Sequence, residues 1–392
     1  MKVLFLTREY PPFEIGGVAR HTACLVKALR KLGVFCRILS FGDPAYSEDG
    51  VTFLEPRSSI LSKSAASLPS DARVPQDIMR FTEASRDIMD KEDFDIVHVE
   101  EPYVGAFVRH AHKVTTIHDT SYGELKSIFR QPSGMSDMKR AIFFCTLGPY
   151  LEWVGAQSSD AIIVPSPQVQ QELENIYRLS SSKISVIRNG VDLEHLPQNM
   201  DKSEAKRALG LSPMPLVFTS AQHVARKRLE TLIDAVALMK TAGGNGFDVV
   251  VGGEGPLTPH LVKRCEERGV SDLIRFVGWL SREKLELHFA AADVFVLTSD
   301  YEAGPISLLE AMAAGAATVS SQIEGFPALM RNGVDGLLFP PGDARALSHN
   351  LNMLLGDAAL RDRLSVAGHR FAQRFDWGAI ARETMDLYGS LL

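Results

Sequence analysis

Short apolar runs alternate with longer amphipathic segments along most of the chain. Runs of four to seven apolar and β-branched residues predict buried strands, and the segments between them have the length of helices. A strand-helix-strand rhythm is typical of parallel sheets covered by helices, so the pattern indicates the α/β class. The strands expected in the N-terminal half are residues 1–7, 34–39, 95–99, 113–117 and 161–164.

The rhythm is interrupted once, near the middle of the chain. Pro197, Gly210, Pro213 and Pro215 gather there, and the strand pattern then restarts. We therefore expect two similar domains, residues 1–195 and 196–370, with residues 371–392 forming a helix that packs back toward the N-terminal domain. Parallel sheets bind ligands beyond the carboxyl ends of their strands, so two facing sheets can share a cleft. The strands expected in the second domain are residues 216–219, 248–251, 273–276, 293–297 and 317–319.

The strand-to-helix junction at residues 298–315 carries two carboxylates, Glu302 and Glu310. Its helix should begin at Gly304-Pro305, since proline is tolerated in the first turn, and should end at Gly315. Free N–H groups in the first turn and the helix dipole favour an anion such as a diphosphate. The residues expected to bind it are Gly304, Pro305, Ile306 and Ser307.

This junction resembles the donor-site signature of the retaining glycosyltransferases of family 4, which have the GT-B architecture of two Rossmann-like domains facing an interdomain cleft. The resemblance extends over nearly the whole chain. Further matching segments are Tyr10 to Val18, His118-Asp119, Asn189 to Asp192, Lys227, Gly252 to Leu257, Phe276 to Trp279, and Gly336 to Asp343.

The resemblance implies a hexose transfer from a nucleoside diphosphate sugar to a hydroxyl of a small metabolite, glycan or lipid. In this family Glu302 would contact the donor sugar, Glu310 the nucleotide ribose, and His118 a sugar hydroxyl. We favour a front-face mechanism over a covalent intermediate, because carboxylates placed in this way do not suit the acid and nucleophile of a glycosidase.

Two further segments are candidates for the donor's phosphates. Gly16 and Gly17 follow the first strand and precede a helix, where their amides could approach an anion, although a plain tight turn explains the pair equally well. Lys227 lies at the start of a helix, where its ammonium could neutralise the leaving diphosphate. A solvated lysine is the alternative.

The chain departs from the family pattern at two positions. Gln222 stands where the family usually has an arginine, so either Arg226 or Arg228 would supply the second cation, unless the helix N-terminus carries more of that role. Ala328 stands where the family often has a glutamate, which puts contacts from that loop in doubt.

No histidine, cysteine or aspartate group shows metal-ligand spacing, so we expect a metal-independent reaction with no cofactor beyond the sugar nucleotide. Asp93 and Asp95 form a D-x-D pair, but they precede a strand instead of following one. A dinucleotide-binding glycine motif would need glycine at the position of Thr258.

Composition agrees with a cytoplasmic enzyme. The 392 residues are 45% hydrophobic, and no apolar run approaches the roughly 18 residues of a membrane span. The first apolar run is broken too early for a signal peptide. A net charge of −6 gives no reason to expect nucleic acid, and the four cysteines are scattered. The aromatic and basic segment 126–153 could contact a membrane, although a core helix is the favoured interpretation.

Two other functions remain open from the sequence. A sugar-nucleotide 2-epimerase of the same architecture would convert the donor without an acceptor. A catalytically silent protein would bind the sugar nucleotide without turnover, which the departures at Gln222 and Ala328 allow.

Overall fold

The computed structural model describes residues 1–13, 16–42, 45–48, 50–57, 74–130, 141–194, 196, 200–244, 246–323 and 330–392. The chain forms two compact units. One contains residues 1–190 and 377–392, and the other contains residues 191–376. The chain thus passes into the second unit after Gly190 and returns to the first at Trp377.

The N-terminal unit is built on an eight-stranded sheet with the order β3-β4-β2-β1-β5-β6-β7-β8. All neighbouring pairs are parallel except β3 with β4. In the central strands β1 and β5 every residue except Lys2 is buried, and all but Lys2 and His98 are apolar, as expected for a parallel sheet covered on both faces. The strands are β1 (Lys2–Leu6), β2 (Phe35–Phe41), β3 (Ser47–Glu48), β4 (Val51–Leu54), β5 (Ile96–Val99), β6 (Lys113–Thr116), β7 (Ala161–Val164) and β8 (Ile184–Val186).

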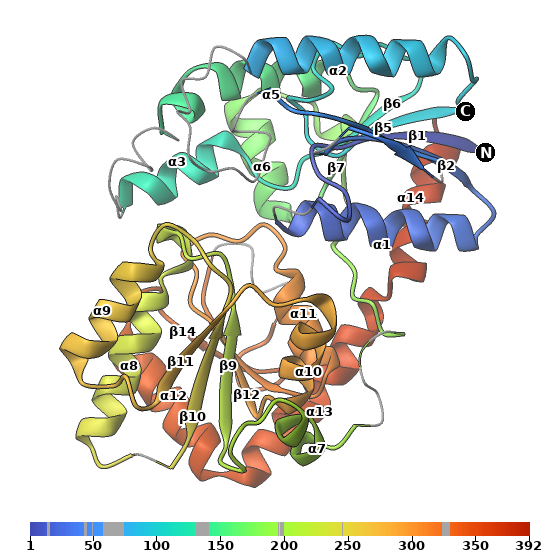
Figure 1. Cartoon of the computed structure of the whole chain (residues 1–392). Helices are drawn as coiled ribbons and strands as arrows, with labels where there is room; N and C mark the ends of the chain where they lie inside the picture. The colour runs from blue at the N-terminus through green and yellow to red at the C-terminus, as the bar shows by residue number, and fades with distance from the viewer. Residues whose placement is uncertain are drawn as a thin grey trace. The chain divides into compact units, whose positions relative to one another are not determined.

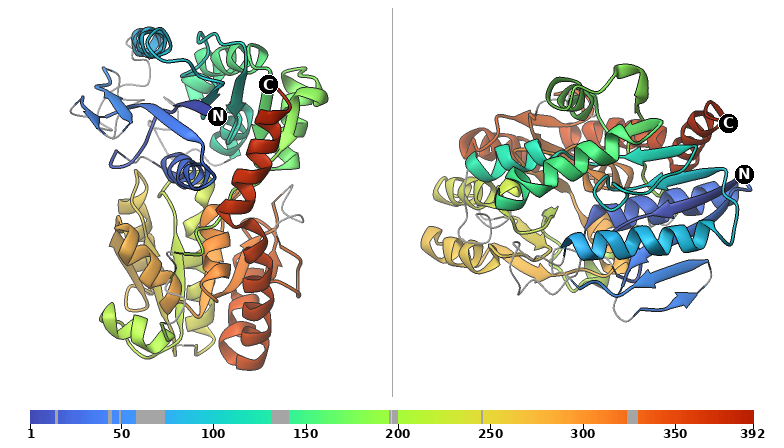
Figure 2. Two further views of the ribbon diagram at one scale, coloured as in Figure 1. Left: turned by 90° about the vertical axis from the view of Figure 1, so that its right-hand side faces the viewer. Right: turned by 90° about the horizontal axis from the view of Figure 1, so that it is seen from above.

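Helices cover both faces of this sheet. The apolar sides of α1 and α14 pack on one face, and α2 packs on the other. Because α14 is the last helix of the chain, both termini lie in this unit (Figure 2). The helices are α1 (Gly17–Lys31), α2 (Val74–Met89), α3 (Ser121–Arg130), α5 (Leu147–Gln157), α6 (Pro167–Ile176) and α14 (Trp377–Gly389), with a 3₁₀ turn η2 (Ser181–Lys183).

The C-terminal unit is built on a six-stranded parallel sheet with the order β11-β10-β9-β12-β13-β14. The order reverses direction at β9, so the loops after β9 and β12 leave the same edge of the sheet side by side. The strands are β9 (Leu216–Ser220), β10 (Asp248–Gly252), β11 (Ile274–Gly278), β12 (Val294–Leu297), β13 (Ala317–Ser321) and β14 (Leu337–Phe339).

Two hydrophobic cores sandwich this second sheet. Helices α8, α9 and α12 form the core on one face, and α7, α10 and α11 form the core on the other, while α13 contributes to both (Figure 1). The helices are α7 (Lys202–Ala208), α8 (Leu229–Thr241), α9 (Thr258–Arg268), α10 (Arg282–Ala291), α11 (Ile306–Ala313), α12 (Ala344–Gly356) and α13 (Ala358–Ala372), with 3₁₀ turns η3 (Ala225–Lys227) and η5 (Gln373–Phe375).

The predicted α/β class with two Rossmann-like domains is confirmed, and every strand expected from the sequence is present within a few residues of its predicted bounds. The pattern missed β3, β4, β8 and β14. Each of these has two to four residues and lies at or next to a sheet edge, so its apolar signal is too short to stand out from a loop.

The aromatic segment expected at residues 126–153 is partly buried. In α5, Leu151 packs in a small core with Ile78 of α2, whereas Tyr150 and Trp153 are 56% and 44% exposed. Its basic residues Lys139 and Arg140 lie outside the described residues. Among the helices that the structure describes, none is both long enough and apolar enough to cross a membrane.

Candidate functional site

Two loops of the C-terminal unit, residues 221–228 and 298–305, come together because they follow the neighbouring strands β9 and β12. One side-chain and one main-chain hydrogen bond join the two loops. The Thr298 hydroxyl donates to the carbonyl of Lys227 at 2.6 Å, and the Asp300 amide donates to the carbonyl of Arg226 at 2.8 Å. The side chains that these loops carry are therefore held in a fixed relation.

Glu302, Lys227 and Arg226 meet at this junction. Lys227 Nζ lies 2.5 Å from Glu302 Oε1, and Arg226 Nη1 lies 3.8 Å from Glu302 Oε2. The Ser299 hydroxyl donates to Glu302 Oε1 at 2.6 Å. Burial raises the pKa of Glu302, but the two cations and the hydrogen bonds more than offset this and hold the pKa below 4.5. Glu302 is therefore an ionised carboxylate between two positive charges.

Arg228 has a different position, although it is close in sequence. Its guanidinium pairs with Asp300. Its backbone is left-handed, with φ 44°, which is uncommon for a residue other than glycine. A Cβ on Gly342 would lie 2.5 Å from Arg228 Nη1, so glycine leaves room for this side chain. Of the two arginines expected to replace the one absent at Gln222, Arg226 is the one beside Glu302.

Helix α11 begins at Ile306, directly after these charges. Pro305 is the extended residue before the helix, with φ −71° and ψ 102°, and not its first residue as the sequence predicted. Its carbonyl accepts the first helical hydrogen bonds, from the amides of Leu308 and Leu309, but its extended ψ makes it the N-cap and not part of the helix. The helix ends as expected before Gly315, which has φ 81°. The first-turn segment from Gly304 to Ser307 thus follows the charged cluster immediately.

Glu310 does not join the Glu302 cluster. It lies within α11, is 2% exposed, and accepts from Arg282 Nη1 of α10 at 2.9 Å. The two carboxylates of the sequence motif are therefore each paired, but with cations from different elements: Glu302 with the loop after β9, and Glu310 with the start of α10.

The glycine-rich loop after β10 packs closely on the loop after β9. A Cβ at Gly253, which has φ 100°, would lie 2.0 Å from the carbonyl oxygen of Ala221, and a Cβ at Gly255 would lie 2.5 Å from that of His223. Both glycines are thus required by contact between two backbones. His223 is a site residue that the sequence reasoning did not select. It is fully buried, its Nδ1 is 2.8 Å from Thr258 Oγ1, and burial lowers its pKa.

In the N-terminal unit, the amide of Gly16 is already occupied. It donates to Glu9 Oε2 at 2.7 Å, and α1 begins at Gly17. Glu14 and Ile15 of the same loop lie outside the described residues, as do residues 324–328, which include Ala328. The glycine pair therefore begins a helix, but an internal carboxylate takes one of the amides expected for a phosphate.

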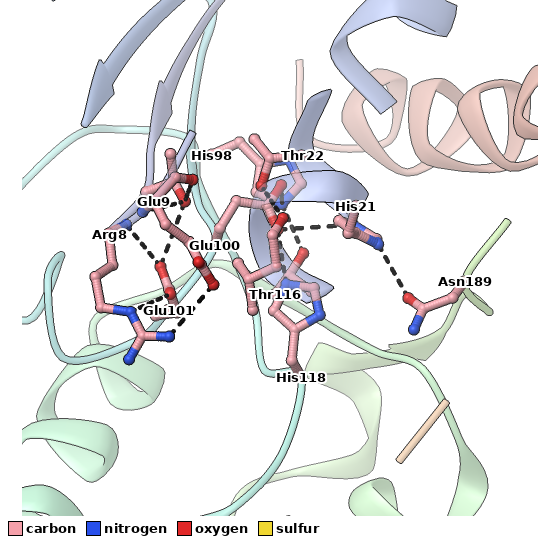
Figure 3. A network of polar contacts seen from close by, with 12 residues as sticks. Arg8, Glu9, His21, Thr22, His98, Glu100, Glu101, Thr116, His118 and Asn189 are labelled. Atoms are coloured by element: carbon pink, nitrogen blue, oxygen red, sulfur yellow. Dashed lines mark hydrogen bonds and ion pairs between the residues drawn. The ribbon is translucent and has the colours of Figure 1, made fainter. Parts of the chain in front are cut away.

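His118 lies in a cluster of buried polar side chains around Glu100 (Figure 3). His118 Nε2 is 3.0 Å from Glu100 Oε2, and His21 Nε2 is 3.6 Å from the same oxygen. His98 Nε2 lies 3.9 Å from Glu100 Oε1, while its hydrogen bonds go to Tyr388 and Thr116. Burial lowers the pKa of each of these three histidines to about 4, so all three are neutral at pH 7.

Arg8 and Glu101 form a second part of this cluster. The Arg8 amide donates to Glu101 Oε2 at 2.8 Å, and Arg8 Nε lies 3.4 Å from Glu101 Oε1. Burial still raises the pKa of Glu101 to about 7. Of the cluster, sequence reasoning selected only His118. His21 carried no signal, because it lies 79 residues from Glu100 in a helix with no spacing motif.

Comparisons with known proteins identify related glycosyltransferases. Residues 201–371 match the model of the glycosyl transferases group 1, and residues 15–195 match that of glycosyltransferase family 4, so the two models together span most of the chain. An uncharacterised glycosyltransferase of Methanocaldococcus jannaschii is 25% identical over 99% of this chain and 98% of its own length. A glycogen synthase of Mycobacterium tuberculosis is 27% identical over 99% of this chain and 94% of its own.

Solved structures show the same architecture. The sucrose-phosphate synthase of Thermosynechococcus elongatus has a TM-score of 0.81 at 22% identity, covering 100% of this chain and 98% of its own. The HepE protein of Anabaena, in complex with UDP-glucose, has a TM-score of 0.73 at 19% identity and full coverage of both chains. At such identities the likeness establishes the fold, which is that of the GT-B glycosyltransferases.

Proposed function

Because this chain belongs to the group 1 glycosyl transferases, with an N-terminal domain of family 4, we propose that it is a retaining hexosyltransferase. Its donor is a nucleoside diphosphate hexose, and its acceptor is a hydroxyl of a small metabolite, glycan or lipid. The observation that carries the proposal is the cluster of Lys227, Arg226 and Glu302 at the start of α11.

The cluster supplies charges suited to a sugar diphosphate. Lys227 and Arg226 balance the diphosphate, and the first-turn amides after Pro305 add hydrogen-bond donors. Glu302 is ionised and accepts hydrogen bonds from sugar hydroxyls. Without a donor, the carboxylate neutralises only one of the two cations, and the remaining positive charge attracts a diphosphate. Under this proposal no divalent cation is needed at the diphosphate.

The surroundings of Glu302 favour front-face transfer. Lys227, Arg226 and Ser299 all approach its carboxylate oxygens, which lowers their nucleophilicity. In the proposed step, the bond from the anomeric carbon to the diphosphate oxygen breaks as the acceptor oxygen bonds to the same face. The acceptor proton passes to the departing diphosphate oxygen, so the anomeric configuration is retained.

We also assign Glu310 to the nucleotide ribose and His118 to a sugar hydroxyl, as the family resemblance implies. His118 Nε2 is bonded to Glu100, so Nδ1 is the ring atom available to a hydroxyl. Lys227 and His118 thus have different roles. Lys227 stabilises negative charge on the leaving diphosphate, and His118 orients the sugar.

The test uses purified protein with UDP-, GDP- and ADP-hexoses and a mixture of candidate acceptors, with and without EDTA. Nucleoside diphosphate release and sugar products are followed by mass spectrometry, and the product anomer is assigned by NMR. Release from one donor class, persisting in EDTA with the donor's anomeric configuration kept, supports the proposal. An isomerised sugar nucleotide would identify an epimerase, binding without release would identify a silent protein, and an inverted anomer would overturn retention.

A further inference from the structure

We propose that His21, Glu100 and His118 form a binding site for a divalent transition metal of the Zn²⁺ type within the N-terminal unit. The inference goes beyond the proposed transfer reaction and does not concern the donor's diphosphate. It rests on the arrangement of three side chains from α1 and from the loops after β5 and β6 (Figure 3).

The spacing of the potential ligand atoms fits one ion. One ligand atom from each residue lies within 4.8 Å of the other two. Glu100 Oε2 is 3.0 Å from His118 Nε2 and 3.6 Å from His21 Nε2. With metal–ligand distances of about 2.0–2.1 Å, neighbouring ligands of a tetrahedral ion lie about 3.4 Å apart. Small shifts of these side chains would therefore bring all three ligand atoms into contact with one ion.

The orientation of His21 also points to a metal. Its Nδ1 lies 3.0 Å from Asn189 Oδ1, an amide oxygen that can only accept, so Nδ1 must carry the hydrogen. The lone pair of Nε2 is then directed toward Glu100 Oε2, which is also an acceptor. A proton or a metal cation between two facing acceptors would satisfy both, and a hydrogen bond from the far ring nitrogen is the usual outer support of a metal-binding histidine.

Glu100 lacks the partners that a buried carboxylate normally has. It is 0% exposed, and its Oε1 is buried without a hydrogen-bond partner among the residues that the structure describes. The residues that the structure describes place no lysine or arginine within 4.0 Å of it, and its ion-pair neighbours are imidazoles only. A buried charge without a counter-charge is costly, and a bound cation would remove that cost.

The donor set identifies the class of metal. Two imidazole nitrogens and one carboxylate oxygen suit Zn²⁺ and similar ions, whereas Mg²⁺ and Ca²⁺ prefer oxygen ligands. His98 is excluded as a ligand, because its two ring nitrogens already meet Tyr388 and Thr116. Three protein ligands leave a fourth position for water or another small ligand.

The experiment titrates tag-free, full-length protein, stripped of metal by a chelator, with ZnCl₂ in a calorimeter, and with Co²⁺ followed by its visible absorption. We expect one Zn²⁺ per chain and a tetrahedral Co²⁺ spectrum. Glu100→Gln and His21→Ala should each weaken Zn²⁺ binding by about 100-fold, because each removes one of the three proposed ligands. Glu101→Gln, the neighbouring carboxylate held by Arg8, is the matched control and should bind within about threefold of the unmodified chain.

Equal affinity of the unmodified chain, Glu100→Gln and His21→Ala would overturn the proposal, as would an equal loss in Glu101→Gln. Circular dichroism confirms that each variant is folded, and His21→Gln replaces any variant that is not. Because the readout is metal binding, its failure would leave the proposed transfer reaction unaffected, and inactivity of the enzyme would leave the metal result unaffected.

Discussion

Each unit of this glycosyltransferase buries a glutamate beyond the carboxyl end of an inner parallel strand, but the charges around the two carboxylates differ. Glu302 lies between Lys227 and Arg226 and accepts from Ser299. Glu100 lies among His21, His98 and His118, and none of its described ion-pair neighbours is a lysine or an arginine. Glu302 thus has cationic partners without a ligand, whereas Glu100 has no lysine or arginine partner among the described residues.

The contrast teaches how burial of a charge relates to function. A carboxylate balanced by cations stays ionised and can exchange those cations with a bound diphosphate. A carboxylate surrounded by neutral imidazoles has no such balance and favours a cation from solution. Substitutions that alter one charge at a time can test whether this difference is real.

The largest expected effect is on turnover in Glu302→Gln. We expect the rate to fall by 100-fold or more, on the order of 3 kcal/mol, because the lost interaction matters mainly in the transition state. Nucleotide affinity should stay within a few-fold, since the cations remain. Initial rates and calorimetry with the nucleoside diphosphate measure the two effects. A rate within threefold of the unmodified enzyme would remove Glu302 from the mechanism.

The next effect is on stability, and it differs between the units. Glu302→Gln should lower the local unfolding free energy of the C-terminal unit by about 2 kcal/mol, because it leaves two cations close together without their anion. In metal-free protein, Glu100→Gln should lower the local unfolding free energy of the N-terminal unit by no more than about 1 kcal/mol, or should raise it. Hydrogen exchange of peptides covering β12 and β5 follows each unit separately. Equal losses in both variants would contradict the contrast in charge balance.

A smaller effect separates the two arginines of the C-terminal site. Arg226→Gln should lower turnover about tenfold, roughly 1.4 kcal/mol, because its guanidinium approaches Glu302. Arg228→Gln is the matched control and should stay within about threefold, because Arg228 pairs with Asp300 instead. Steady-state kinetics with the identified donor compare them. The assignment of Arg226 fails if Arg228→Gln has the larger effect.

The smallest effect is on the acid dependence of stability. The pKa of Glu302 is below 4.5 in the folded protein, so its contribution is present above pH 4.5 and is lost as the pH falls through the folded value. The free energy of unfolding of Glu302→Gln should therefore fall less steeply with decreasing pH below pH 4.5. The difference in slope corresponds to at most one bound proton. Denaturant unfolding between pH 3 and 6, followed by the same β12 peptides, measures this slope. Identical slopes would mean that Glu302 is not held ionised by its neighbours.

Much of the C-terminal site could be predicted from the sequence. Lys227, Glu302 and the start of α11 lie at strand-to-helix junctions, where apolar strands and glycine or proline mark the ends of elements. The pattern did not decide between Arg226 and Arg228, because the left-handed backbone at Arg228 turns its side chain toward Asp300. Nor did it indicate that Glu310 pairs with Arg282, which lies 28 residues earlier on another helix.

The sequence by itself determined the α/β class, the presence of two domains and the positions of most strands along the chain, because these follow from local alternation of apolar and polar residues. Only the tertiary structure brought His21, Glu100 and His118 together. These residues come from three elements that meet because β1, β5 and β6 are neighbours in the sheet and α1 packs on its face. Local periodicity sets where strands and helices form, whereas contacts between distant residues depend on packing that no short pattern encodes.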